Sequence, residues 1–187
     1  KLIRGCKNTI IPSSVTEICS SAFYYCSSLK DIVIPSSVTE IGSCAFSNCS
    51  SLKEIVIPSS VTEIGKYAFS DCSSLKEIVI PSSVTKIGSH AFCECTGLGK
   101  IVVEKGNPKY DSREGCNAII ETETGKLIVV CKSTKIPVNN KVVKTRKWWL
   151  FGSKTTVYPK VTEIGKSVFS GCSSLTEIVI PNSVTDI

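Results

Sequence analysis

A repeat of 23 residues is the feature that most constrains how this chain can fold. Prolines recur at positions 12, 35, 58 and 81, and the unit reads IPSSVTEIGSCAFSNCSSLKEIV with small changes. One such unit cannot bury its own apolar edge, whereas stacked units bury each other's, so the sequence predicts a solenoid stabilised by neighbouring coils. The aligned columns are Val15, Val38, Val61 and Val84; Ile18, Ile41, Ile64 and Ile87; Phe23, Phe46, Phe69 and Phe92; Cys26, Cys49, Cys72 and Cys95; and Leu29, Leu52, Leu75 and Leu98.

Within one unit, the segment 29–34 has the L-x-x-L-x-L pattern of a leucine-rich-repeat strand. Strand alternation turns Ile32 and Ile34 inward and Val33 outward. The proline that follows lacks a ladder donor, so the strand is expected to end there. The next stretch, 38–42, is long enough for only a second brief strand and a turn. We therefore predict short parallel strands in each coil.

The repeat also resembles a known family. The motif L-x-x-I-x-I-P-x-x-V-x-x-I-G-x-x-A-F-x-x-C is similar to the BspA-like (Treponema-type) leucine-rich repeats of bacterial surface proteins, and the match covers residues 12–103 and 159–187 closely. The usual Asn of other leucine-rich repeats is absent, with Ser37 or Ser60 near that place, which favours this subclass. The resemblance implies a curved parallel-sheet solenoid, secretion or surface display, and binding of host or matrix proteins.

After Val103 the repeat is interrupted. Two apolar runs flank Glu123-Thr124-Gly125, which predicts a β-hairpin, and its second arm, KLIVVCKSTKIP, matches the amino terminus, KLIRGCKNTIIP. The predicted fold class is a β-rich leucine-rich-repeat solenoid, a right-handed coil with a parallel sheet. Its predicted parts are a partial hairpin arm (1–11), four regular repeats (12–103), a hairpin insertion (104–136), a degenerate repeat (137–158), and a regular repeat with the start of the next (159–187).

The segment 138–160 departs most from the repeat. Aligned with the unit at Pro12, it becomes a degenerate coil with one deletion, in which Trp148 falls in the Phe23 column; a looped-out insertion is the alternative. Positive charge concentrates here, because nine Lys and Arg and no acidic residue lie between Thr124 and Thr162, while the rest of the chain has thirteen bases and sixteen acids. Such a patch attracts anionic partners better than an even distribution would.

Two groups of residues are candidates for ligand contact. Aromatic residues and arginine are enriched at binding hot spots, which predicts a contact site of Lys144, Arg146, Lys147, Trp148 and Trp149, with Trp149 as the apolar anchor. The alternative is that Trp148 only fills the Phe column and the bases are a solvated face. The second group is an outward column on the strand face, formed by Val33, Val56, Val79 and Val102. Its alternative explanation is β-propensity on a solvated sheet.

The eleven cysteines do not predict a metal site or a cofactor. No C-x-x-C pair occurs, and no cluster supplies the ligand set that zinc prefers. One core column holds five cysteines, which we predict to be reduced and buried: Cys26, Cys49, Cys72, Cys95 and Cys172. Cys116 could in principle pair with Cys131.

No catalytic constellation emerges from the sequence. The single histidine, His90, is predicted at the surface because Ser21, Cys44 and Tyr67 hold the same column, and without a partnered acid or nucleophile it cannot sustain a triad. Gly165-Lys166-Ser167 mimics the end of a phosphate-binding loop, but the first glycine of that motif is missing. The sequence therefore predicts a chain that is not an enzyme.

The function predicted is a non-enzymatic protein-interaction module, at the cell surface or secreted. Its expected partner is a protein ligand, an acidic host or matrix protein being the favoured class, bound in an adhesin-like way by a monomer. Nucleic acid is not expected, because no known recognition signature is present. Membrane insertion is not expected, because no run approaches the roughly eighteen apolar residues of a membrane span. The alternative is a passive spacer that presents other domains of a longer surface protein.

Overall fold

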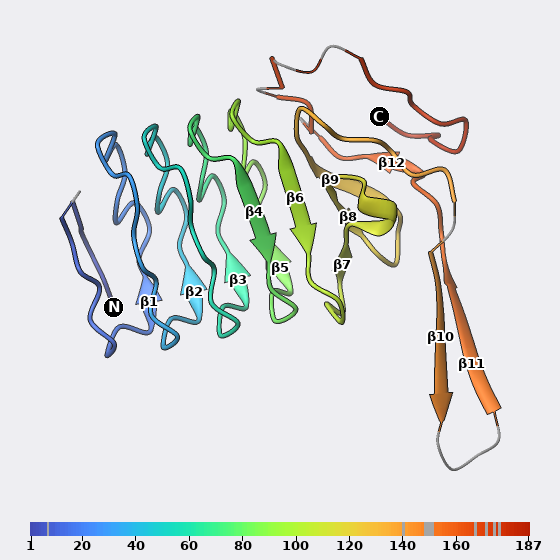
Figure 1. Cartoon of the computed structure of the whole chain (residues 1–187), viewed down its shortest axis with the longest axis horizontal. Helices are drawn as coiled ribbons and strands as arrows, with labels where there is room; N and C mark the ends of the chain where they lie inside the picture. Colours follow the sequence, from blue (N-terminus) through green and yellow to red (C-terminus); the bar gives the residue numbers. More distant parts are fainter. Residues whose placement is uncertain are drawn as a thin grey trace.

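The repeats stack side by side as the coils of a solenoid, in chain order from the amino terminus (Figure 1). The structure is a computed structural model that describes residues 1–6, 8–139, 141–147, 152–166, 168–170, 172–173, 175 and 177–187. The described part consists of β-strands and turns, with one short 3-10 helix. The predicted solenoid is thus confirmed.

A parallel sheet of two-residue strands links the first four coils. Its order is β1 (Glu17–Ile18), β2 (Glu40–Ile41), β3 (Glu63–Ile64) and β5 (Lys86–Ile87). Each strand pairs with the residue 23 positions later, as in Ile18 with Ile41 and Ile41 with Ile64. The sequence period is therefore the coil period.

The predicted strand at 29–34 is only partly right. The equivalent segments pair as a parallel ladder between β4 (Glu77–Ile80) and β6 (Lys100–Val103), whereas in earlier coils a bond such as Lys53 N to Lys30 O, 3.2 Å, joins neighbours. The predicted alternation is confirmed, since Ile78 and Ile80 are buried while Val79 is exposed. The main ladder instead runs through the shorter strands that precede the Ala-Phe turn.

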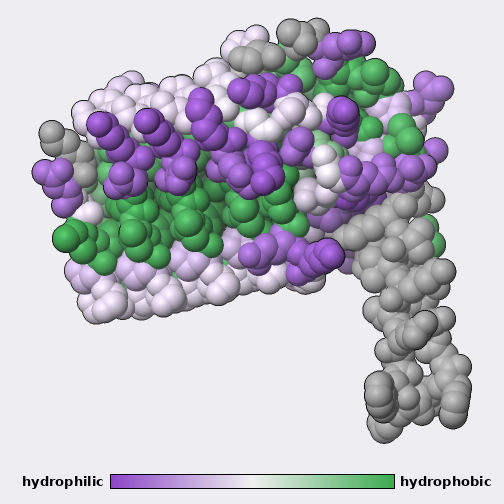
Figure 2. All heavy atoms as spheres, viewed as in Figure 1, coloured by the Kyte–Doolittle hydropathy of each residue, from purple (hydrophilic) through white to green (hydrophobic). Residues whose placement is uncertain are grey.

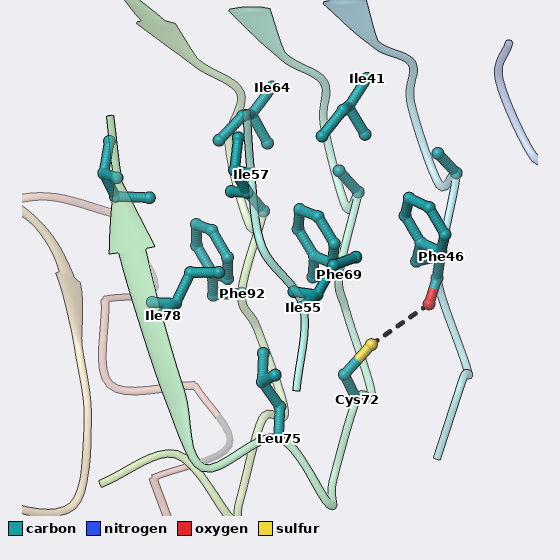
Figure 3. Close-up of a cluster of buried hydrophobic side chains, with 14 of the residues drawn as sticks. Ile41, Phe46, Ile55, Ile57, Ile64, Phe69, Cys72, Leu75, Ile78 and Phe92 are labelled. Atoms are coloured by element: carbon teal, nitrogen blue, oxygen red, sulfur yellow. Dashed lines mark hydrogen bonds between the residues drawn. The ribbon is translucent and has the colours of Figure 1, made fainter. Parts of the chain in front are cut away.

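The Ala-Phe turn of each coil places one phenylalanine in a continuous stack. The rings of Phe23, Phe46, Phe69 and Phe92 lie nearly parallel, with successive centroids 5.0, 5.3 and 5.4 Å apart. Figure 3 shows the last three of these rings side by side. Backbone bonds such as Phe23 N to Ala45 O, 2.7 Å, link successive turns. These bonds offset the cost of the left-handed conformation, which recurs twice per coil at Ser21, Cys44, Tyr67 and His90 and at Tyr25, Asn48, Asp71 and Glu94.

Close backbone approach explains the glycine that precedes this turn. A Cβ at Gly65 would lie 2.5 Å from the backbone nitrogen of Ser43 in the preceding coil. At the opposite turn, serine hydroxyls join the coils: Ser60 Oγ donates to the Val38 carbonyl at 2.6 Å, and Ser37 and Ser83 repeat this contact. Small residues in the repeat therefore set the coil spacing.

The predicted hairpin interrupts the coils. β8 (Ala118–Glu121) and β9 (Lys126–Val130) pair antiparallel, with β7 (Tyr110–Asp111) outside β8 and the 3-10 helix η1 (Arg113–Gly115) between β7 and β8. On its other edge β9 pairs in parallel with β12 (Glu163–Ile164) of the last coil. The arm β9 thus substitutes for a coil strand, as the amino-terminal arm does through the parallel bridge of Leu2 to Ile18.

The β8–β9 hairpin also separates two hydrophobic cores. Ile119 and Val129 pack with the first four coils, while Ile120 and Val130 pack with the last coil. This alternation follows from the two faces of a strand. The hairpin is therefore a shared wall that both cores need.

Candidate functional site

A second hairpin projects from the solenoid between the insertion and the last coil (Figure 1). It consists of β10 (Lys141–Lys147) and β11 (Gly152–Tyr158), which pair antiparallel from Lys141 with Tyr158 to Lys147 with Gly152. The prediction of a degenerate coil over 137–158 is wrong, and the looped-out insertion matches the pairing. The reason is that β12 stacks directly on β9, which leaves no coil position between them.

The structure places the basic contact residues of the sequence prediction on this hairpin. In β10, Lys144, Arg146 and Lys147 pair with Thr155, Ser153 and Gly152 of β11. Trp148 and Trp149 lie outside the described residues. The basic residues of the candidate site therefore belong to the half of β10 that is farther from the Lys141–Tyr158 base of the hairpin.

The second candidate is an apolar band along the outer strand face, bordered by a hydrophilic row (Figure 2). Ile10 precedes the predicted column by 23 residues and extends it, so the band comprises Ile10, Val33, Val56, Val79 and Val102. Ile10 is 89% exposed and Val33 82%, while Val79 is 38% exposed and Val102 is half-buried. The border contains side chains of both charges. Lys100 Nζ, for example, lies 2.7 Å from Glu77 Oε1 of the neighbouring coil.

The predicted cysteine column is buried in its middle and not at its ends. Cys49, Cys72 and Cys95 are buried, whereas Cys26 and Cys172 are half-buried, and no disulfide bond joins the described cysteines. Cys72 Sγ donates to the Phe46 carbonyl at 3.2 Å (Figure 3), and Cys49 bonds the Phe23 carbonyl in the same way. Burial raises the pKa of the Cys49 thiol to about 12. The buried middle of the column therefore joins neighbouring coils, and its thiols are held in the un-ionised, poorly nucleophilic form.

The remaining sequence candidates have structural roles. Cys116 and Cys131 belong to different cores on opposite sides of the β8–β9 hairpin, so they do not pair. His90 is half-buried rather than exposed, because its ring stacks on Tyr67 with centroids 5.0 Å apart. The backbone N–H of Gly165 bonds the Leu127 carbonyl, so it does not face a phosphate.

Sequence reasoning missed a buried polar cluster in the insertion. Arg113 Nε and Nη2 each lie 2.8 Å from an oxygen of Asp111, Thr122 Oγ1 donates to Asp111 at 2.8 Å, and Arg113 Nη1 donates to the Pro159 carbonyl. Asn107 is also buried and bonds the carbonyls of Pro81 and Val84. The cluster fixes the hairpin insertion to the fourth coil and to the first residue of the last coil.

No catalytic or metal centre stands out in the described part of the chain. Its His, Cys, Asp and Glu side chains form no group of three with the geometry to hold a metal ion. None of its helices is long and apolar enough to cross a membrane. The projecting hairpin and the outer band are the two surfaces that correspond to the ligand-contact residues predicted from the sequence.

Comparison with known families decides what kind of repeat this is. The profile described as "BspA type Leucine rich repeat region" matches six copies over residues 4–113 and 130–187. The chain belongs to the BspA-type leucine-rich repeat family. The family predicted from the repeat motif is thus confirmed. A search among curated protein sequences found no match.

Solved structures of bacterial leucine-rich repeat proteins share the fold. A leucine-rich repeat protein from Bacteroides ovatus is 30% identical, with a TM-score of 0.55 over 93% of this chain and 37% of that one. The pneumococcal vaccine antigen PcpA is 25% identical, with a TM-score of 0.63 over 91% and 44%. A leucine-rich cell surface protein from Faecalibacterium prausnitzii is 26% identical, with a TM-score of 0.52 over 94% and 55%. The chain thus spans between 37% and 55% of these structures.

Proposed function

We propose that this chain is a non-enzymatic, adhesin-like protein-binding segment of a bacterial cell-surface or secreted protein, and that it contacts an acidic host or matrix protein through the β10–β11 hairpin. The observation that carries the proposal is the projection of this hairpin from the stacked coils (Figure 1). A passive spacer needs only the coils. A segment that leaves the coils and returns adds nothing to their stacking.

Charge supports the same surface. The stretch that includes the hairpin holds nine of the chain's 22 basic residues and no acidic residue between Thr124 and Thr162. Surface charges of one sign accelerate encounter with an oppositely charged partner and make binding sensitive to salt. The cell-surface name of the Faecalibacterium prausnitzii protein supports the location.

The hairpin can be removed cleanly. Lys141 and Tyr158 are direct partners at its base, so their Cα atoms are separated by about 4.5–5.5 Å. A two-residue Asn-Gly turn spans such a gap. Replacing 142–157 by Asn-Gly is therefore expected to leave both cores intact, which circular dichroism and urea unfolding can verify.

The test is capture of the chain by cultured epithelial cells and by an immobilised basement-membrane extract. We expect the hairpin-deleted variant and the double variant Arg146→Ala, Trp149→Ala to lose most of the capture, the arginine effect being larger at low salt. The matched control for the double variant is Lys53→Ala, Lys76→Ala on the coil face, which removes two positive charges where Arg146→Ala removes one. Equal capture by parent and hairpin-deleted chains would exclude the hairpin as the site.

A further inference from the structure

The phenylalanine stack is interrupted at Phe92. Four rings follow one another through the first four coils. The hairpin insertion occupies the next coil position, and its arm β9, KLIVV, is followed by Cys131 and has no Ala-Phe turn. The next such turn is Val168-Phe169 of the last coil. The column therefore lacks one aromatic ring between the fourth and the last coils.

A cavity of about 290 Å³ lies at this break. Its apolar wall includes Ala91 and Phe92 of the fourth coil, Val130 and Cys131 at the end of β9, and Val168 of the last coil. Beside it the two coils touch directly, with Cys93 Sγ 3.3 Å from Ser170 Oγ. Three separate parts of the chain thus form the walls of the cavity, which is partly open to solvent.

Size and wall chemistry favour a single aromatic ring. An apolar cavity of about 150 Å³ binds benzene, and pockets for drug-sized ligands begin at about 300 Å³. The volume here suits one ring with a short substituent. Phe92 offers a stacking partner for such a ring. Cys95 and Cys172 also line the cavity, and their sulfur atoms would pack favourably against an aromatic ring.

Charge at the cavity favours an anion. Lys126, Lys132 and Lys166 line it, and its described lining includes no acidic side chain. Lys126 forms an ion pair with Glu163. Lys132 and Lys166 are exposed, and across the described ranges neither forms an ion pair with an acidic residue.

We propose that this cavity is a binding site for a small monocyclic aromatic carboxylate. The ring occupies the place of the missing phenyl group against Phe92, and the carboxylate lies beside Lys132 and Lys166. This site is distinct from the β10–β11 hairpin and does not depend on the proposed adhesin function.

The test is calorimetry and thermal unfolding of the intact chain with three probes. Phenylacetate has the ring and the charge, cyclohexylacetate has the charge without the aromatic ring, and 2-phenylethanol has the ring without the charge. We expect phenylacetate to bind at one site and raise the Tm. Cyclohexylacetate should bind roughly 2- to 10-fold more weakly, as expected for loss of an aromatic contact.

Variants separate the two parts of the site. Cys172→Phe fills the cavity and should abolish binding of phenylacetate. Lys132→Ala, Lys166→Ala should weaken phenylacetate by about 5-fold or more and leave 2-phenylethanol unchanged, while the control Lys53→Ala, Lys76→Ala should change neither. Undiminished binding to Cys172→Phe, or no binding of phenylacetate at millimolar concentration, overturns the site. Equal affinity for phenylacetate and 2-phenylethanol overturns the carboxylate assignment.

Discussion

The buried ion pair of the insertion permits a quantitative test of the structure. Replacing Asp111 with alanine removes the acceptor for Arg113 Nε, Arg113 Nη2 and the Thr122 hydroxyl. The side chain of Arg113 is only 4% exposed, so water cannot take over the lost contacts. The variant leaves a guanidinium buried without its counter-charge.

The expected cost is large compared with that of a surface pair. Breaking a buried, hydrogen-bonded pair from one side costs about 3–5 kcal/mol. The matched control is Glu77→Ala, which breaks the Lys100–Glu77 contact of 2.7 Å between side chains that are 57% and 44% exposed. Exposed pairs of this kind contribute about 0–1 kcal/mol. The two variants should therefore differ by several kcal/mol although the two contacts have similar lengths.

Urea unfolding followed by far-ultraviolet circular dichroism measures the difference. With a slope of about 2 kcal/mol/M, a loss of about 4 kcal/mol moves the midpoint by about 2 M. The double variant Asp111→Leu, Arg113→Met should recover much of the loss, because an apolar replacement leaves no unpaired charge. If Asp111→Ala shifts the midpoint no more than Glu77→Ala does, the pair is not buried as described.

Three further predictions concern the coils. Phe69→Ala should cost about 3–5 kcal/mol of unfolding free energy, while Val56→Ala, at a residue 78% exposed, should stay within about 0.5 kcal/mol; equal effects in urea unfolding would contradict the inward and outward assignments. In the native chain a thiol reagent should label exposed Cys6 quickly and buried Cys49 only after denaturation, as mass spectrometry of the peptides can show. Because burial raises the pKa of the Cys49 and Cys95 thiols from the ordinary 9.0 to about 12, only the unfolded thiols ionise as pH first rises above 9.0. The unfolding free energy should then fall between pH 9 and 12, by up to about 1.4 kcal/mol per pH unit and thiol, and Cys49→Ala should fall less steeply; parallel slopes would refute the coupling.

The regular coils could be predicted because the repeat period determines which residues of neighbouring coils contact one another. Each column of identical residues 23 positions apart must stack on itself, so Ile41 lies between Ile18 and Ile64. Strand alternation then separates buried Ile34 from exposed Val33 without further information. The repeat does not show which segment of the coil forms the continuous hydrogen-bond ladder, because both the segment at 29–34 and the shorter one at 38–42 have strand-like alternation.

The hairpin β10–β11 was harder to predict, for a physical reason. Aligned to the repeat, Val143 and Val157 occupy apolar columns of a coil, and any β-strand supplies apolar residues at such intervals. The pairing that decides the structure joins Lys141 to Tyr158, within one segment and not between coils. Fixed columns cannot reveal such a local antiparallel contact.

The polar cluster was missed because residue type argues against it. Asp and Arg are among the residues that are almost never fully buried unless paired, so Asp111 and Arg113 look like loop surface in a sequence. Their burial depends on Arg113 reaching the Pro159 carbonyl, 46 residues away in the chain. The signal available was the short spacing of Asp111 and Arg113, which suits a local ion pair but does not indicate its burial.

The insertion also explains how the solenoid can carry an irregular projection without losing its stacking. A coil contributes stability only through its two neighbours, so any element that offers apolar residues on both sides can replace one. The β8–β9 hairpin does so, with Ile119 toward the first core and Ile120 toward the second, and β9 continues the parallel ladder to β12. Between β9 and β12, Cys131 still packs in the first core and Ile136 and Val161 in the second, whereas Lys141–Lys147 and Gly152–Tyr158 pair with each other as the β10–β11 hairpin. The length and charge of that hairpin can therefore change while the residues of both cores stay in place, which makes this junction the point where a coil of fixed geometry can carry a projecting element.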